Sequence, residues 1–120
     1  MSHMDGRLKI LKHLIGKTGL DVVEAFTPPP GGDLPISEAR KSWGDDMTIW
    51  INVPEVIFFY DRRKIEEYVI NLLREMAPGR RFLFGITEDI PESRFESLYP
   101  FVSTVQKYGK YPINLSLFKC

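Results

Sequence analysis

Short apolar runs alternate with segments of helical hydrophobic spacing, and this alternation constrains the fold more than any other sequence feature. The runs are rich in branched and aromatic residues, which favour β-strands, and they span residues 20–26, 47–53 and 82–86. Helical spacing is present at residues 7–15, 35–43, 62–76 and 92–108. Strands that alternate with amphipathic helices pair in parallel, through right-handed crossovers. The sequence therefore predicts an α/β fold with a parallel sheet.

Glycine and proline mark the ends of these elements. Gly16 ends the first helical segment, and Pro78 stops the segment 62–76. Pro100 lies inside the last helical segment, which we expect to bend or divide. The run 47–53 is apolar nearly throughout, which is typical of a strand covered on both faces.

Composition excludes several classes of protein. A chain of 120 residues predicts a single domain, residues 1–120. Sixteen basic side chains balance sixteen acidic ones, so no net field favours nucleic acid or an anionic membrane. No apolar run has the ~20 residues that a membrane span needs. The only cysteine is Cys120, which excludes an internal disulfide and favours the cytoplasm as the compartment.

Each apolar run ends in polar residues and a proline. The first run contains Glu24 and is followed by Thr27, and the other two end in the same way, with Asn52, Glu55, Thr87 and Glu88. In parallel α/β folds, the carboxyl ends of the strands meet at one rim, where ligands and catalytic groups collect. We therefore expect an active face here, with Glu24, Asn52 and Glu88 as catalytic candidates and Thr27, Glu55 and Thr87 as substrate-binding candidates. The alternative is that Thr, Asn and Pro simply form turns.

The predicted sheet is too small to close on itself. A parallel barrel needs about eight strands, and three are apparent in this sequence. Unpaired strand edges attract further strands. The alternatives are an open sheet that forms a homodimer and part of a larger barrel.

Several segments carry a resemblance to a known family. HMDGRLK (3–9), DVVEAFTPPPGGDLPISEARKSWG (21–44), WINVPE (50–55), FGITEDIP (84–91) and KYGKYPI (107–113) resemble the C-terminal part of the uroporphyrinogen decarboxylase-like superfamily. This family includes the heme-pathway decarboxylase and the cobamide-dependent methyltransferases, both (β/α)8 barrels. The resemblance implies the last three to four βα units of such a TIM barrel, completed by an N-terminal half. It also implies a tetrapyrrole or a methylated small molecule as substrate.

The departures from the family pattern concern the metal. The methyltransferase branch holds zinc with a His-x-Cys-Gly motif and a later cysteine, and it acts with a corrinoid. His3 matches the histidine, whereas Asp5 replaces the cysteine and no internal cysteine follows. A thiolate zinc site is therefore excluded, and His3 and Asp5 remain metal candidates, with Glu24 or Glu88 as an oxygen ligand. The decarboxylase branch needs no metal.

Each candidate also has a structural interpretation. MSHM resembles a cloning remnant, and terminal residues such as His3 are usually disordered. Glu24 lies in an apolar run, where a buried carboxylate must be paired, protonated or metal-bound, and a salt bridge to Arg40 would satisfy it. Glu88 could instead stabilise a helix N-terminus.

Two functions follow from these observations. The first is the catalytic-face portion of a uroporphyrinogen decarboxylase-like enzyme, acting on a tetrapyrrole or in corrinoid-dependent methyl transfer. The alternative is a non-catalytic module that assembles with another chain or with itself.

Overall fold

The computed structural model describes residues 1–87 and 89–118, which form two compact units. The first unit comprises Met1–Pro54 and Arg81–Thr87, and the second comprises Glu55–Arg80 and Glu88–Cys120. The two units are described separately below.

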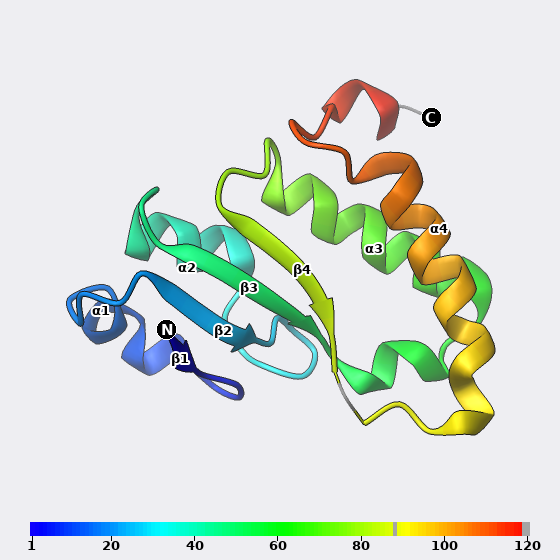
Figure 1. Cartoon of the computed structure of the whole chain (residues 1–120), viewed down its shortest axis with the longest axis horizontal. Coiled ribbons are helices and arrows are strands. Elements are labelled where there is room, and N and C mark those ends of the chain that lie inside the picture. The colour runs from blue at the N-terminus through cyan, green and yellow to red at the C-terminus, as the bar shows by residue number, and fades with distance from the viewer. Residues whose placement is uncertain (88, 119–120) are drawn as a thin grey trace. The chain divides into compact units, whose positions relative to one another are not determined.

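The first unit is built on a parallel sheet of four strands in the order β1-β2-β3-β4 (Figure 1). The strands are β1 (Ser2–His3), β2 (Val22–Phe26), β3 (Thr48–Val53) and β4 (Phe82–Ile86). Each neighbouring pair is parallel, which confirms the α/β fold with strands that alternate with helices. β1 adds one strand to the three apolar runs. The sheet is open, with β1 and β4 at its edges, and closure into a barrel stays a prediction.

The first helical segment is shorter than the spacing predicts. A 3-10 turn, η1 (Lys9–Leu11), leads into a single α-turn, α1 (Lys12–Ile15), in place of a helix over residues 7–15. A 3-10 helix has three residues per turn and an α-helix has 3.6. Apolar residues at α-helical spacing therefore do not stay on one face where η1 joins α1. Ile15 is buried, whereas Leu11 and Leu14 are exposed.

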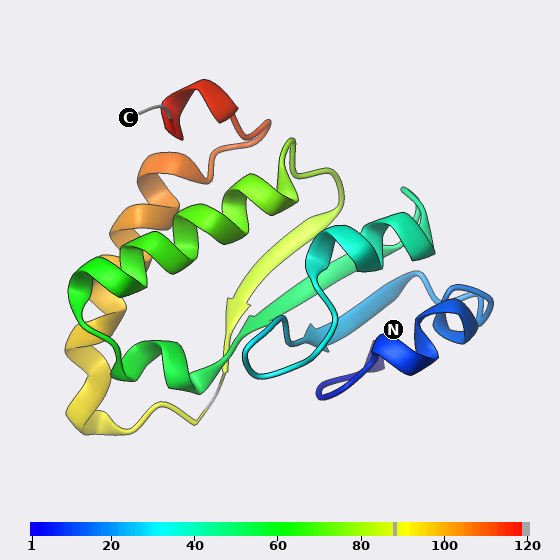
Figure 2. The same ribbon diagram turned by 180° about the vertical axis from the view of Figure 1, so that it is seen from behind.

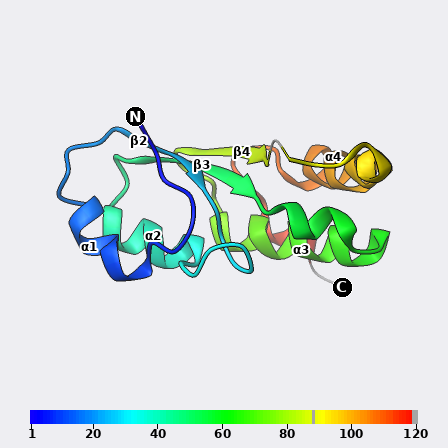
Figure 3. The same cartoon turned by 90° about the horizontal axis from the view of Figure 1, so that it is seen from below.

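Helix α2 (Ile36–Trp43) anchors α1 to the sheet. The Trp43 indole Nε1 donates to the carbonyl of Lys12 at 2.7 Å, and its ring meets the Phe26 ring edge-on at 5.7 Å. Lys12 and Glu38 add an ion pair at 3.3 Å. Figure 3 shows α1 and α2 on the same side of the sheet.

The two faces of the sheet differ in burial. Alternate residues of β3 point to opposite faces, and Ile49, Ile51 and Val53 are fully buried. On the other face, Trp50 is 39% exposed and Leu83 of β4 is 46% exposed. The prediction that residues 47–53 are covered on both faces is therefore wrong, because α1 and α2 cover one face alone of this unit's sheet.

Arg40 fastens the amino ends of β3 and β4. Its guanidinium donates to the carbonyls of Gly44, Met47 and Arg81 at 2.7, 2.6 and 3.1 Å. It also lies over the Phe82 ring, 4.5 Å from the centroid. The forked geometry of arginine suits such multiple acceptance by backbone oxygens.

The second unit is helical, with α3 and α4 side by side (Figures 1 and 2). Its elements are η2 (Glu55–Phe59), α3 (Arg62–Met76), η3 (Glu92–Ser97), α4 (Leu98–Tyr108) and η4 (Leu115–Phe118). The Asp61 carboxylate caps α3 by accepting from the backbone N–H of Lys64 at 2.9 Å.

The predicted division of the last helical segment is confirmed, at the junction of η3 and α4. Pro100 lies in the first turn of α4, where backbone N–H groups have no intrahelical acceptor, so the missing donor costs little. In the part of the chain that the structure describes, no helix combines the length and apolar character that a bilayer crossing requires.

Candidate functional site

The site centres on a hydrogen-bonded pair from neighbouring strands, His3 of β1 and Glu24 of β2. The two residues stand opposite each other in the parallel register, and His3 Nδ1 lies 2.6 Å from Glu24 Oε2. The side chains are 60% and 30% exposed, so both can reach a ligand.

Two expectations about Glu24 need correction, and His3 lies in the two-residue strand β1. Glu24 is half-buried and not fully buried, because its face of the sheet is open. Its partner is His3, whereas Arg40, the partner considered from the sequence, donates to backbone carbonyls instead.

A β-bulge directs the Glu24 side chain. The register between β2 and β3 shifts between Val23 and Phe26, and Ala25 adopts a φ of 57°. A left-handed conformation costs about 1–2 kcal/mol for a residue with a Cβ atom. Bulges are common beside active sites, where they re-aim a side chain, and strained residues cluster there too. Alanine has no preference for this conformation, so no sequence signal could have located the bulge.

The open face of the sheet forms the floor of the site. Trp50 and Asn52 of β3 alternate onto the same face as Glu24, and Asn52 lies nearer the carboxyl end. Opposite Asn52 stands Gly85, where an added Cβ would lie 3.0 Å from the Trp50 indole nitrogen. Glycine at this position therefore lets the indole lie across β4. Glu24, in the middle of β2, and Asn52, next to the end of β3, share one face of the sheet.

The loops after three strands gather at the carboxyl end of the sheet. An added Cβ at Gly32 would lie 2.0 Å from the Thr27 carbonyl oxygen and 2.9 Å from that of Gly6. At Gly31 it would lie 3.0 Å from Pro54, which follows β3. The Thr27 hydroxyl donates to the Ala25 carbonyl at 3.0 Å.

The remaining candidates are Thr87, Asp5, Glu55 and Glu88. Thr87 follows β4, and its backbone N–H donates to the Val53 carbonyl at 3.2 Å. Asp5 is exposed after β1. Glu55 is the first residue of η2 and belongs to the second unit. Glu88 lies outside the described residues.

A catalytic zinc ion takes three protein ligands, and this site supplies two. His3 and Glu24 could bind a metal, but residues 1–87 and 89–118 hold no group of three or more His, Cys, Asp or Glu side chains arranged for one. Asp5 does not join the pair in such a group. The described residues therefore do not fit the zinc of the methyltransferase branch.

Comparisons with protein-family models and with curated protein sequences find no match for this chain. The fold and the site define a class: a parallel α/β protein with a histidine–carboxylate pair on two neighbouring strands. Such pairs are common in proton transfer, where the carboxylate orients the imidazole.

Proposed function

We propose that this chain is the C-terminal catalytic-face portion of a uroporphyrinogen decarboxylase-like enzyme, in which His3 and Glu24 transfer protons to a tetrapyrrole. The observation that carries the proposal is the 2.6 Å contact between His3 and Glu24, on an open face beside a strained bulge. The resemblance of residues 3–9 and 21–44 to the family supplies the substrate class.

The pair is suited to donate and recover a proton. An ionised carboxylate only accepts hydrogen bonds, so Glu24 requires the proton on Nδ1 of His3. The second ring nitrogen, Nε2, is then available to exchange a proton with a ligand. Glu24 also stabilises the imidazolium that forms when Nε2 is protonated.

Loss of carbon dioxide from an acetate side chain of a pyrrole requires a group that both donates a proton and accepts one. Protonation of the ring carbon next to the one that bears the side chain places positive charge on the side-chain carbon and the ring nitrogen. This cation accepts the electron pair of the breaking carbon–carboxylate bond as an exocyclic double bond to the methylene carbon. Carbon dioxide leaves, the former methylene carbon takes up a proton to become a methyl group, and the ring proton is released. One proton is consumed for each carbon dioxide formed. The decarboxylase branch needs no metal. It therefore suits a site where the described residues offer no group of three or more metal-binding side chains, and we favour it over methyl transfer.

The direct test is anaerobic incubation of the full chain with uroporphyrinogen, followed by chromatography of the products and measurement of carbon dioxide. We expect products with fewer carboxyl groups. Glu24→Gln and His3→Gln should each lower the rate by about 100-fold or more, the usual contribution of general acid–base catalysis. Glu67→Gln, a change at an exposed ion pair of the second unit, is the control and should leave the rate unchanged. Absence of conversion by the unaltered chain, or equal rates in all variants, would refute the proposal.

A second function is favoured by the open apolar face of the sheet. Trp50 and Leu83 remain exposed there, and among residues 1–87 and 89–118 β1 and β4 each pair with a strand on one side alone. Exposed apolar surface and unpaired strand edges are typical of assembly surfaces. A non-catalytic module that assembles with itself predicts a dimer in size-exclusion chromatography with light scattering. Under this alternative Trp50→Glu should abolish the dimer, and a monomer at all concentrations would exclude self-assembly.

A further inference from the structure

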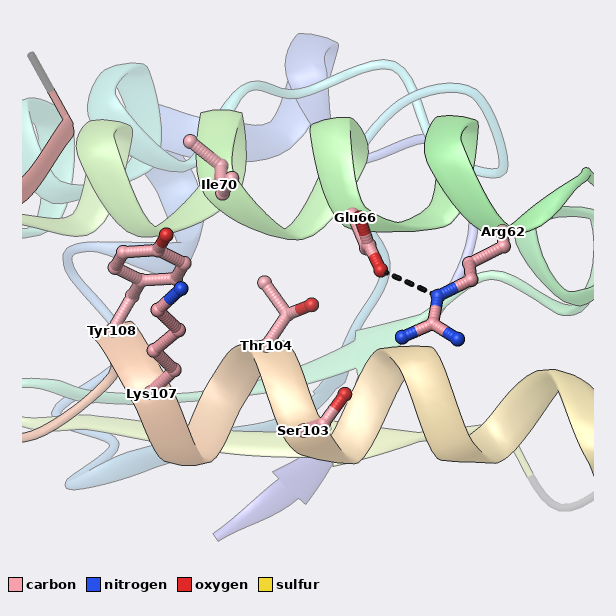
Figure 4. A pocket seen from close by; sticks show the side chains of 7 residues that line it. All are labelled: Arg62, Glu66, Ile70, Ser103, Thr104, Lys107 and Tyr108. Carbon is pink, nitrogen blue, oxygen red and sulfur yellow. Dashed lines mark hydrogen bonds and ion pairs between the residues drawn. The ribbon is translucent and has the colours of Figure 1, made fainter. Parts of the chain in front are cut away.

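A pocket of about 210 Å³ lies between α3 and α4 in the second unit (Figure 4). It belongs to neither the sheet nor the His3–Glu24 site. Its lining combines polar and apolar surface and comes from both helices: Arg62, Glu66, Ile70, Ser103, Thr104, Lys107 and Tyr108.

Arg62 presents donors to this pocket. Its Nε donates to Glu66 Oε1 at 2.9 Å, one turn along α3. Figure 4 shows the two terminal guanidinium nitrogens pointing from this contact toward α4. Glu66 thus orients the arginine and occupies one of its donor groups, while the terminal nitrogens keep four N–H donors.

Residues of α4 add a second cation and a phenol. Lys107 Nζ lies 5.0 Å from the centre of the Tyr108 ring, and both polar ends are on the side that faces α3 (Figure 4). The hydroxyls of Ser103 and Thr104 donate to the Pro100 carbonyl at 3.2 and 2.6 Å, so their protons are already engaged. The donors available to a ligand are therefore those of Arg62, Lys107 and Tyr108.

The charges of the lining select the class of ligand. Two cations, Arg62 and Lys107, face one anion, Glu66, which leaves one net positive charge and a surplus of donors. Such a set repels a metal cation and favours a compact anion with several acceptor oxygens. A volume of about 210 Å³ corresponds to about seven water volumes, at about 30 Å³ each, which accommodates a tetrahedral oxyanion that carries a small substituent.

We infer that the pocket between α3 and α4 binds a phosphate group, either as the free ion or as a small phosphomonoester. Arg62 supplies positive charge at one end of the pocket, and Lys107 and Tyr108 supply a cation and a neutral donor at the other end (Figure 4). The inference is independent of the proposed catalytic function, because every lining residue lies in the second unit.

The chain contains a matched control for Arg62. Arg63 makes the same ion pair one residue further on, with Nε 3.1 Å from Glu67 Oε1. Its side chain is 87% exposed, close to the 78% of Arg62, but it does not line the pocket. Arg62→Gln and Arg63→Gln thus remove the same charge and the same type of pair from the same helix.

The test is a titration of the ¹⁵N-labelled full chain with inorganic phosphate at constant ionic strength, followed by the amide shifts of Thr104 and Lys107. We expect saturable shifts, with binding weakened about tenfold by Arg62→Gln or Lys107→Gln. Arg63→Gln should bind like the unaltered chain. Glu66→Gln should bind more tightly because it removes the one anion, an effect that partial unfolding would not produce.

The outcomes separate the sources of the phosphate group. Tighter binding of glycerol phosphate assigns a phosphomonoester, and tighter binding of inorganic phosphate assigns the free ion. Absence of saturable shifts with either probe, equal weakening by Arg63→Gln, or an equal response to acetate would overturn the inference.

Discussion

Gly32→Ala tests whether the loop after β2 packs against the rim as the structure describes. An added Cβ at Gly32 would lie 2.0 Å from the carbonyl oxygen of Thr27 and 2.9 Å from that of Gly6. Both atoms belong to the backbone, so no side-chain rotation can relieve the contact. The loop must move, and the hydrogen bond from Gly32 N–H to the Pro28 carbonyl, 3.2 Å long, would be strained.

The expected loss of unfolding free energy is the sum of three effects. Overpacking costs about 1–3 kcal/mol. Weakening of one hydrogen bond adds about 0.5–1.5 kcal/mol. Replacement of glycine by alanine lowers the conformational entropy of the unfolded chain, which offsets about 0.4–1 kcal/mol of this loss. The net destabilisation is therefore about 2 kcal/mol.

Gly19→Ala is the matched control in the same unit. Gly19 has a φ of 76°, yet an added Cβ there would meet nothing within 4 Å. The left-handed conformation costs about 1–2 kcal/mol, and the unfolded-state effect offsets part of it, so about 0.5–1 kcal/mol remains. If backbone conformation alone decided the loss of stability, alanine would destabilise the protein more at Gly19. If packing decides it, alanine destabilises the protein more at Gly32.

Urea unfolding followed by tryptophan fluorescence distinguishes these orders. Both tryptophans of the chain, Trp43 and Trp50, lie in the first unit, so the signal reports on that unit. We expect a lower midpoint for Gly32→Ala than for Gly19→Ala. The reverse order would show that the loop does not press on Thr27 and would refute the packing of the rim.

Three further changes test other parts of the molecule. Asp61→Ala removes the cap of α3 and should cost about 1 kcal/mol of stability in thermal unfolding followed by circular dichroism, whereas Asp61→Ser should keep most of it. Arg40→Met leaves three backbone carbonyls without their charged donor and should cost about 2–4 kcal/mol in urea unfolding; a loss below that of Asp61→Ala would contradict its fastening role. Burial, then the Glu75 carboxylate and Tyr60, raise the pKa of Tyr68 above its ordinary value of 10.0. The unfolded chain therefore loses this proton first, and the stability that neutral Tyr68 provides is present below pH 10.0 and falls as the pH rises above it. Urea midpoints measured across this range should decline more steeply for the unaltered chain than for Tyr68→Phe.

The sequence predicts best those elements whose determining interactions join residues close together in the chain. The helix 62–76 and the strand 82–86 have the predicted bounds, because caps, proline and hydrophobic spacing act within a few residues. The prediction of one helix over residues 7–15 is wrong because only part of its apolar stripe is covered. Leu8 and Ile15 are buried, whereas Leu11 and Leu14 are exposed. Burial depends on what packs against a segment, which spacing within the segment does not specify.

The candidate site shows the same division. The order of strands and helices was enough to predict the parallel pairing of the strands. The sequence alone could not select His3 over Arg40 as the partner of Glu24. That choice depends on which strands become neighbours and on their register.

The sequence by itself therefore determined the succession of elements, the direction of the strands and the end of the sheet where polar groups collect. These properties arise from hydrophobic period and from turn residues, which are written in short stretches of chain. Only the tertiary structure decided the pairing of His3 with Glu24, the bulge at Ala25 and the pocket between α3 and α4. Each of these joins residues distant in sequence or depends on a backbone conformation that alanine does not favour by itself.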